Sequence, residues 1–277
     1  MDRTASRSSG LRLGQCAILL ALAVLIALAI AAPWITPYDP TETNPTAALR
    51  HPSWLNLFGT DALGRDIFSR TLAATRTDLV IASVSVLAAR IGGSALGAAA
   101  GWCGGWVDRM ISRLMDTIMA FPLFVLAVGI AAAMGNSVTS VVVATVVVNL
   151  PFYARQVRTE VSRRRNAGYV EAARLAGFAP VAILTGQILP NLAPPLMVQS
   201  SLNMGWAILN AAGLSFIGLG IRPPTPEWGI MVSEGAAYIF SGEWWLFVFP
   251  GGMLMLAVLV FSLAGDALRD RLDPRRE

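Results

Sequence analysis

Six long apolar runs constrain the fold of this chain more than any other feature. A helix needs roughly 20 apolar residues to cross a hydrocarbon core of about 30 Å, and a spanning segment must satisfy its own backbone hydrogen bonds. With 55% of its 277 residues hydrophobic and only 14% charged, the chain is too apolar for a soluble domain. We predict an all-α integral membrane protein with six transmembrane helices, at about 13–34, 79–101, 114–135, 137–154, 196–219 and 244–265.

The distribution of arginine predicts how these helices are oriented. All 21 basic residues are Arg. If the N-terminus lies inside, the predicted cytoplasmic segments hold about three times as many Arg residues as the external segments, apart from one Arg within a span. Cytoplasmic loops are enriched in basic residues. Both termini are therefore predicted to be cytoplasmic.

The first apolar run has some features of a secretory signal. It ends in Ala29-Ile30-Ala31, which resembles a signal-peptidase site. Signal sequences have shorter apolar regions of about 7–15 residues. An uncleaved membrane anchor is therefore favoured, and a cleaved signal is the alternative.

Glycine and proline predict how the helices pack and where they bend. Gly93, Gly97, Gly101 and Gly105 recur every fourth residue, so they lie on one helical face and allow close approach of another backbone. Proline interrupts helical hydrogen bonding. Pro122 and Pro151 are therefore predicted to kink or end the third and fourth spans, and the polar stretch 102–116 is predicted to be an inter-helix turn.

Charged residues near the spans have two interpretations each. Arg90 is the only basic residue inside a predicted span, and its charge is costly there unless it faces a cavity or an acidic partner. It could line a translocation path, or it could snorkel or form a structural pair. Asp108 and Arg113 could pair with a neighbouring subunit or belong to an ordinary polar turn.

Two external segments are predicted, at 36–78 and 221–243. In the first, the run 58–66 is rich in turn formers and charges, so it could cap an external mouth or form a solvated loop, which is the simpler interpretation. The second leads into a short amphipathic helix. Its Trp228, with Trp244 and Trp245, has the placement of an interfacial aromatic belt.

A polar island follows the Arg-rich stretch after the fourth span. Tyr169 to Ala176 is predicted to be a helix that ends at Gly177, and a second helix is predicted from Pro180 to Leu189, before Pro190. The small side chains of Ala172, Ala173 and Ala176 would let the first helix enter a partner's groove. An ordinary cytoplasmic loop is the alternative.

This island resembles the EAA loop of ABC-importer permeases. The match consists of Glu171-Ala172-Ala173, then Gly177 and Leu189-Pro190 at the family's spacing, with Gln187 in the usual place of Ile. The resemblance implies a type I importer permease fold. It also implies that this segment is a coupling helix that fits a groove on a cytoplasmic ATPase subunit.

Further motifs resemble the peptide/nickel subgroup of these permeases, and its shorter C-type subunit. One departure is Ala211, where the subgroup often has Glu. The matching segments are 59–66 with Ser69-Arg70, 104–108, 214–220, 223–229, Pro250-Gly251 and 265–274.

The resemblance also implies an organisation and a set of partners. Residues 1–76 would hold the N-terminus, first span and external segment, 77–266 the permease core with the EAA loop at about 166–190, and 267–277 a cytoplasmic tail. The partners would be a homologous permease, two ATPase subunits and an extracytoplasmic solute-binding protein, in a bacterial or archaeal plasma (inner) membrane. A phosphate-binding loop that ends in Gly-Lys-Ser/Thr cannot occur without Lys. ATP and Mg²⁺ are therefore expected on the ATPase subunits, with no catalytic role and no cofactor in this chain.

Polar residues within the spans are the candidates for the transport path. Asn203 and Asn210 are seven residues apart, on nearly one helical face. Each could line a cavity or form an interhelical hydrogen bond. The full set of candidates is Arg90, Asn149, Gln199, Ser200, Asn203 and Asn210.

Peptides are the expected cargo, and nickel or a metal chelate is the alternative. Two other classes compete with an ABC permease. A secondary transporter or channel usually needs an ionisable relay or a constriction in the membrane, and apart from Arg90 the spans offer little of this kind. An intramembrane hydrolase is disfavoured because the single His51 is external.

Overall fold

A computed structural model describes the backbone of residues 3–272 and the side chains of residues 14–271. Within this part of the chain the structure is helical, with a single isolated bridge between Thr60 and Asp66. The helices are α1 (Arg3–Ile35), α2 (Ile67–Cys103), α3 (Gly105–Ala120), α4 (Leu123–Met134), α5 (Val138–Arg164), α6 (Gly168–Leu175), α7 (Pro180–Ile183), α8 (Ala193–Phe216), α9 (Trp228–Ala236) and α10 (Trp245–Leu272).

Five helical segments are long and apolar enough to cross a membrane on their own, and a bent pair brings the number to six. The bent pair is α3 and α4, whose axes differ by 92°. The break lies at Phe121-Pro122, because proline cannot continue the backbone ladder. The six-helix membrane fold and the bend at Pro122 are confirmed. The polar turn predicted at 102–116 is wrong, because α3 begins at Gly105.

Pro151 does not end its helix, which was one of the two predicted outcomes. It lies inside α5, which continues to Arg164 and carries the Arg-rich stretch as helix. The fourth span is therefore longer than the predicted 137–154. Helix α2 is also longer than predicted, and it runs without a break past residues 76 and 77.

The glycine stripe of α2 packs directly on the backbone of α5. A Cβ atom added to Gly97 would lie 2.3 Å from the carbonyl oxygen of Ala154, and one added to Gly101 would lie 2.7 Å from that of Arg158. Gly93 meets α5 in the same way, whereas Gly105 has open space around it. The predicted close packing is confirmed for three of the four glycines, and α2 with α5 forms the central pair of the fold.

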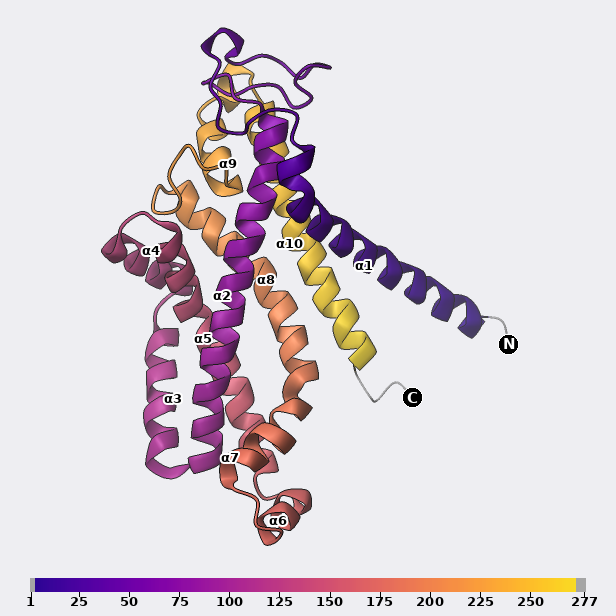
Figure 1. Cartoon of the computed structure of the whole chain (residues 1–277), viewed down its shortest axis with the longest axis vertical. Helices are drawn as coiled ribbons and strands as arrows, with labels where there is room; N and C mark the ends of the chain where they lie inside the picture. Colours follow the sequence, from indigo (N-terminus) through magenta and orange to yellow (C-terminus); the bar gives the residue numbers. More distant parts are fainter. Residues whose placement is uncertain (1–2, 273–277) are drawn as a thin grey trace.

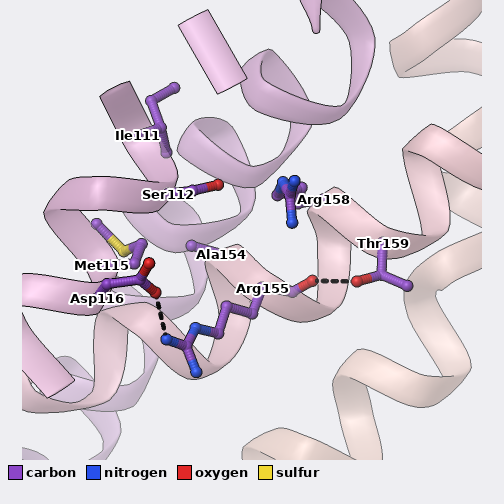
Figure 2. Close-up of a pocket in the computed structure, with 8 residues that line it drawn as sticks. All are labelled: Ile111, Ser112, Met115, Asp116, Ala154, Arg155, Arg158 and Thr159. Carbon is purple, nitrogen blue, oxygen red and sulfur yellow. Dashed lines mark hydrogen bonds and ion pairs between the residues drawn. The ribbon is translucent and has the colours of Figure 1, made fainter. Parts of the chain in front are cut away.

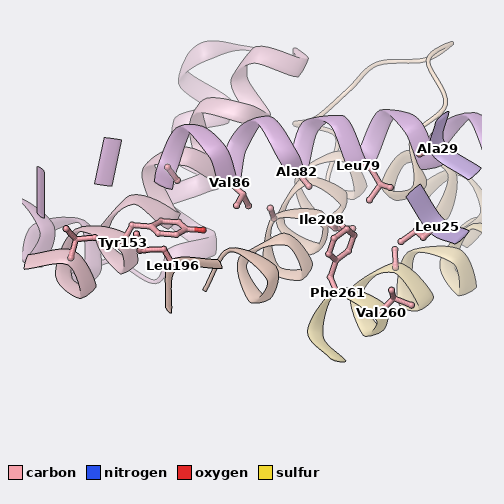
Figure 3. Close-up of a cluster of buried hydrophobic side chains, with 14 of the residues drawn as sticks. Leu25, Ala29, Leu79, Ala82, Val86, Tyr153, Leu196, Ile208, Val260 and Phe261 are labelled. Carbon is pink, nitrogen blue, oxygen red and sulfur yellow. The ribbon is translucent and has the colours of Figure 1, made fainter. Parts of the chain in front are cut away.

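The helices pack around a core shared by α1, α2, α5, α8 and α10 (Figure 3). Only the C-terminal part of α1 joins this core, through Leu25 and Ala29, and the rest of α1 diverges from the bundle (Figure 1). The short helices α6 and α7 lie at one end, and α9 with the segment before α2 lies at the other (Figure 1). We call these the α6 end and the α9 end.

The run 58–66, directly before α2, is largely buried and is not a solvated loop, whereas most of 36–57 is exposed. Arg65 is 3% exposed and pairs with Asp61 at 2.5 Å, and its Nη2 lies 3.2 Å from the carboxylate of Glu234 in α9. Arg70 is 1% exposed and donates to the backbone oxygen of Pro40 at 2.9 Å. The charges in this run therefore form internal pairs that fix the segment to α2 and α9.

Two tryptophans predicted for an interfacial belt are buried, and the indole N–H of each forms a hydrogen bond to the backbone. Trp228 donates its indole N–H to the oxygen of Thr71, and Trp245 donates to that of Thr60. Trp244 is half exposed, as expected for an interfacial residue. The predicted short helix that begins at Trp228 is confirmed.

Candidate functional site

The polar island forms α6 at one tip of the molecule (Figure 1). Gly177 has φ of +81°, a conformation that favours glycine. The N–H of Phe178 donates to the oxygen of Ala173 at 3.1 Å, and the N–H of Gly177 donates to that of Arg174 at 3.0 Å. This pair of bonds is a Schellman motif, so the predicted helix stop at Gly177 is confirmed.

One face of α6 attaches it to the rest of the chain. Val170 and Ala173 are buried and join the main core. The guanidinium carbon of Arg174 lies 5.1 Å from the ring centre of Trp102, near the end of α2. Ala172 is exposed, but Ala173 faces inward and cannot contribute to an outward small-residue surface in this structure. Helix α6 therefore contacts α2 directly.

The second predicted helix, from Pro180 to Leu189, is present, and it widens over its second half. Helix α7 comprises Pro180–Ile183, and a wider π-type turn follows in which the N–H of Leu189 donates to the oxygen of Leu184 at 2.9 Å. A short 3-10 turn then begins at Pro190. This irregular path places Leu189 partly buried and Pro190 exposed, just before α8.

The outer face of the α6–α7 segment is apolar, which sequence reasoning missed. Leu175, Phe178 and Val181 are 90%, 55% and 69% exposed, and Glu171 is exposed beside them. Large apolar side chains gathered on a surface mark interaction sites. The sequence could have indicated this apolar face, because Leu175 and Phe178 lie on either side of the helix stop at Gly177.

Four of the six polar candidates line one pocket between α4, α5 and α8. Its volume is about 540 Å³. Asn203 and Asn210 do share a face of α8, and Asn149 joins them from α5. Apolar and aromatic side chains make up the rest of the wall. The lining residues are Leu123, Phe124, Val148, Asn149, Phe152, Gln199, Leu202, Asn203, Trp206, Leu209, Asn210 and Gly213.

Arg90 and Ser200 are not in the lining of this pocket. Arg90 is half-buried on α2 and forms no ion pair with the residues that the structure describes. An acidic partner for Arg90, one of the predicted alternatives, is therefore absent from 14–271. Ser200 accepts a hydrogen bond from the hydroxyl of Tyr153 at 3.2 Å and serves helix packing.

A polar pocket of about 470 Å³ lies between α3 and α5 (Figure 2). Asp116 accepts from Arg155 at 2.6 Å on its rim, and Arg158 donates Nη2 to Asp108 at 2.8 Å nearby. Asp108 thus pairs within its own chain, and the predicted pairing of Asp108 with a neighbouring subunit is not needed. These paired charges connect α3 to α5 and leave no free charge for a ligand among those named.

The described helices form a membrane-crossing bundle with an amide-lined pocket and an exposed apolar tip. The comparisons with known proteins show the class of protein to which this bundle belongs. The model for binding-protein-dependent transport system inner membrane components matches residues 93–277, and the model for the N-terminal TM domain of oligopeptide transport permease C matches residues 17–52. The chain belongs to the family of binding-protein-dependent transport system inner membrane components.

Similar proteins cover nearly the whole chain. A di/tripeptide transport system permease protein of Pseudomonas aeruginosa is 42% identical, over 93% of this chain and 86% of that one. A dipeptide transport system permease protein of Escherichia coli is 40% identical, over 93% and 87%. Two inward-facing crystal forms of the MetNI methionine ABC transporter share the fold, with TM-scores of 0.56 and 0.58 at 19% and 18% identity. They cover 71% and 74% of this chain, and 93% and 97% of the solved chains.

Proposed function

We propose that this chain is the permease subunit of an ATP-driven importer of short peptides. It would form the translocation pathway together with a homologous permease. Two ATPase subunits would bind at the α6 end, and an extracytoplasmic binding protein would deliver the peptide at the α9 end. Both termini would then be cytoplasmic, in the inner membrane.

The observation that carries the proposal is the exposed tip of α6. Leu175, Phe178 and Val181 present apolar surface that is costly to leave in water, and Glu171 adds a charge that a basic groove would pair with. The inner face of the same helix is anchored by Val170 and Ala173. A segment whose outer face binds an ATPase and whose inner face packs on the core is suited to transmit force from that ATPase to the spans.

The ATP chemistry belongs on the partner subunits. The chain has no Lys and therefore lacks the phosphate-binding loop that ends in Gly-Lys-Ser/Thr. ATP and Mg²⁺ would be bound by the ATPase subunits, and Glu171, Ala172, Ala173, Gly177, Leu189 and Pro190 would couple their closure to the spans.

The names of the related proteins support short peptides as the cargo. The relatives compared above are named for dipeptide or di/tripeptide transport. The nickel alternative has no comparable support. The amide and aromatic lining of the pocket between α4, α5 and α8 suits a peptide better than a metal ion.

The test is peptide uptake by the assembled transporter in liposomes. The complex, purified through a tag on this chain and supplied with its binding protein, should import labelled Ala-Ala only when hydrolysable ATP is supplied on the cytoplasmic side. A proton gradient without ATP should give no uptake. Uptake that persists without ATP while a gradient is kept would contradict the proposal and favour a secondary transporter.

A further inference from the structure

The pocket between α4, α5 and α8 is lined without any ionisable side chain. Its walls are aliphatic and aromatic, and its only strongly polar groups are the side-chain amides of Asn149, Gln199, Asn203 and Asn210. Seven of the lining residues come from a single stripe of α8, which runs from Gln199 to Gly213 at helical spacing. One face of α8 therefore forms most of the pocket wall, and α4 and α5 form the rest.

Two of these amides have hydrogen-bonding groups that the chain itself does not use. Asn210 is 6% exposed, and its amide forms no hydrogen bond with the residues that the structure describes. Asn149 is 3% exposed and donates Nδ2 to the oxygen of Thr145 at 2.8 Å, while its Oδ1 has no partner in that part of the chain. The Oδ1 of Asn203 accepts from Gln199 at 2.9 Å, whereas its Nδ2 is buried and has no partner among the described residues.

An unused amide in an apolar wall has a cost. Removing a polar group from water without a hydrogen bond destabilises a protein by about 1–3 kcal/mol. Among the pocket amides this cost falls on the Nδ2 of Asn203, which is fully buried without a partner in the described part of the chain. The amide of Asn210 and the Oδ1 of Asn149 have no partner there either, but they keep accessible surface in the pocket lining. They are therefore free to bond with a molecule that enters the pocket.

We propose that this pocket binds the main-chain peptide group of the transported peptide. A side-chain amide holds an N–H donor next to its C=O acceptor, which matches the C=O and N–H of a peptide bond. Asn210 supplies this pair, and the Oδ1 of Asn149 supplies a second acceptor. The aromatic rings of Phe124, Phe152 and Trp206 contact the cargo's side chains without selecting among them.

This proposal rests on the proposed peptide-import function and adds the chemistry that is recognised. Nickel-type ions favour imidazole, thiolate or carboxylate ligands, and none of these lines the pocket. The charged ends of a short peptide would also find no partner here. The site recognises the peptide bond. The charged termini and the length of the peptide are recognised by other parts of the transporter.

The test compares Ala-Ala with alanyl-lactate, in which an ester oxygen replaces the peptide N–H. Uptake of both is measured with the assembled, reconstituted transporter at saturating binding protein, for the wild type and for Asn210→Leu. For each protein we take the ratio of Ala-Ala uptake to alanyl-lactate uptake, and we compare this ratio between the wild type and the variant. The binding protein's own preference is the same in both ratios, so it cancels. Loss of one hydrogen bond should reduce the wild type's preference for Ala-Ala by roughly five-fold in the variant.

Two further variants make the result specific. Asn149→Leu should lower the preference in the same direction, and it replaces Asn210→Leu if that variant does not assemble. Leu209→Ala, which removes an apolar wall of the same pocket, should slow both substrates by the same factor and leave their ratio unchanged.

The possible results separate this proposal from the proposed function. ATP-dependent uptake of Ala-Ala with an unchanged ratio in both Asn variants would overturn the peptide-bond site and leave the importer assignment standing. Absence of ATP-dependent peptide uptake by the wild type would overturn both. A reduced ratio in the Asn variants together with an unchanged ratio in Leu209→Ala supports the site.

Discussion

The guanidinium group of Arg174 lies over the ring of Trp102, with 5.1 Å between the guanidinium carbon and the ring centre. Arg174 belongs to the exposed helix α6, and Trp102 packs against the main core at the end of α2. This stacked pair is thus a direct link between the tip where an ATPase would bind and the longest membrane-crossing helix.

Loss of this contact should increase the amount of ATP hydrolysed per imported peptide. A cation–π contact at a partly exposed site contributes about 0.5–1 kcal/mol, so Arg174→Gln should raise the ATP hydrolysed per imported peptide by roughly two- to five-fold. The measurement is simultaneous ATPase activity and Ala-Ala uptake in liposomes. Arg163→Gln, on the exposed end of α5, is the control and should leave the ratio unaltered. An unaltered ratio in Arg174→Gln would remove this pair from the coupling path.

A single methyl group at Gly97 should disrupt the packing of α2 on α5. The added carbon would lie 2.3 Å from the oxygen of Ala154, which is backbone and cannot rotate away. Overpacking of this kind costs about 1–3 kcal/mol. Gly97→Ala should therefore lower the thermal unfolding temperature in detergent.

Gly92→Ala is the matched control, because its added carbon meets only a Leu150 side-chain methyl at 3.6 Å. Alanine also favours helix over glycine by about 1 kcal/mol. The control should be neutral or stabilising. Equal destabilisation by the two variants would show that the α2–α5 contact is looser than described.

The ion pair between Asp108 and Arg158 should be replaceable by its reverse. The pair joins α3 to α5 through two hydrogen bonds, one of them 2.8 Å from Nη2 to Oδ2. Asp108→Arg and Arg158→Asp should each lower the unfolding temperature, and the double variant should recover most of the loss. Partly exposed pairs contribute about 0.2–1 kcal/mol, and the more exposed Arg163–Glu160 pair should show a smaller effect when reversed. Failure of the double variant to recover would contradict a direct pairing.

Glu227 should make the stability of the α9 end depend on pH. Burial raises the pKa of Glu227 above its ordinary value of 4.5, although hydrogen bonds from the N–H groups of Gly229 and Ile230 act in the opposite direction. A raised pKa in the folded state means that the protonated form is favoured by folding. Its stabilisation is complete below about pH 4.5 and is lost as the pH rises through the higher folded value.

The unfolding temperature of the purified transporter should therefore fall as the pH is raised above about 4.5, and the fall should be shallower in Glu227→Gln. Glu234→Gln is the control, because Glu234 is more exposed and pairs with Arg65. The same pH dependence in the wild type and in Glu227→Gln would show that another group is responsible.

Much of the fold follows from the apolar runs and from glycine. Gly93, Gly97 and Gly101 predicted the contact that they make, because a side chain of one hydrogen atom at every fourth position has few other uses in a membrane helix. Proline was less informative. Pro122 lies at the break between α3 and α4, whereas Pro151 lies inside α5. Residue type alone did not distinguish these two outcomes.

The features of the site that follow from local helix geometry could be predicted from the sequence. The positions of side chains that are buried against distant residues could not. The stop at Gly177 and the shared face of Asn203 and Asn210 follow from helix geometry alone. The burial of Arg65 and Trp245 depends on partners far away in the sequence, Glu234 and Thr60 respectively. Residue type favoured a solvated position for Arg65 and an interfacial position for Trp245, and in the structure both side chains are buried beside these partners.

The central claim is that the segment from Glu171 to Pro190 couples ATP hydrolysis to transport. The most direct measurement is ATP-driven uptake by Glu171→Lys transporter in liposomes, together with the amount of ATPase subunit retained on the purified permease. We expect an inserted, folded permease that retains less ATPase and imports less than a tenth of the wild-type peptide, whereas Asn166→Lys, just before α6, behaves as wild type. Normal uptake and normal ATPase retention in Glu171→Lys would contradict the claim.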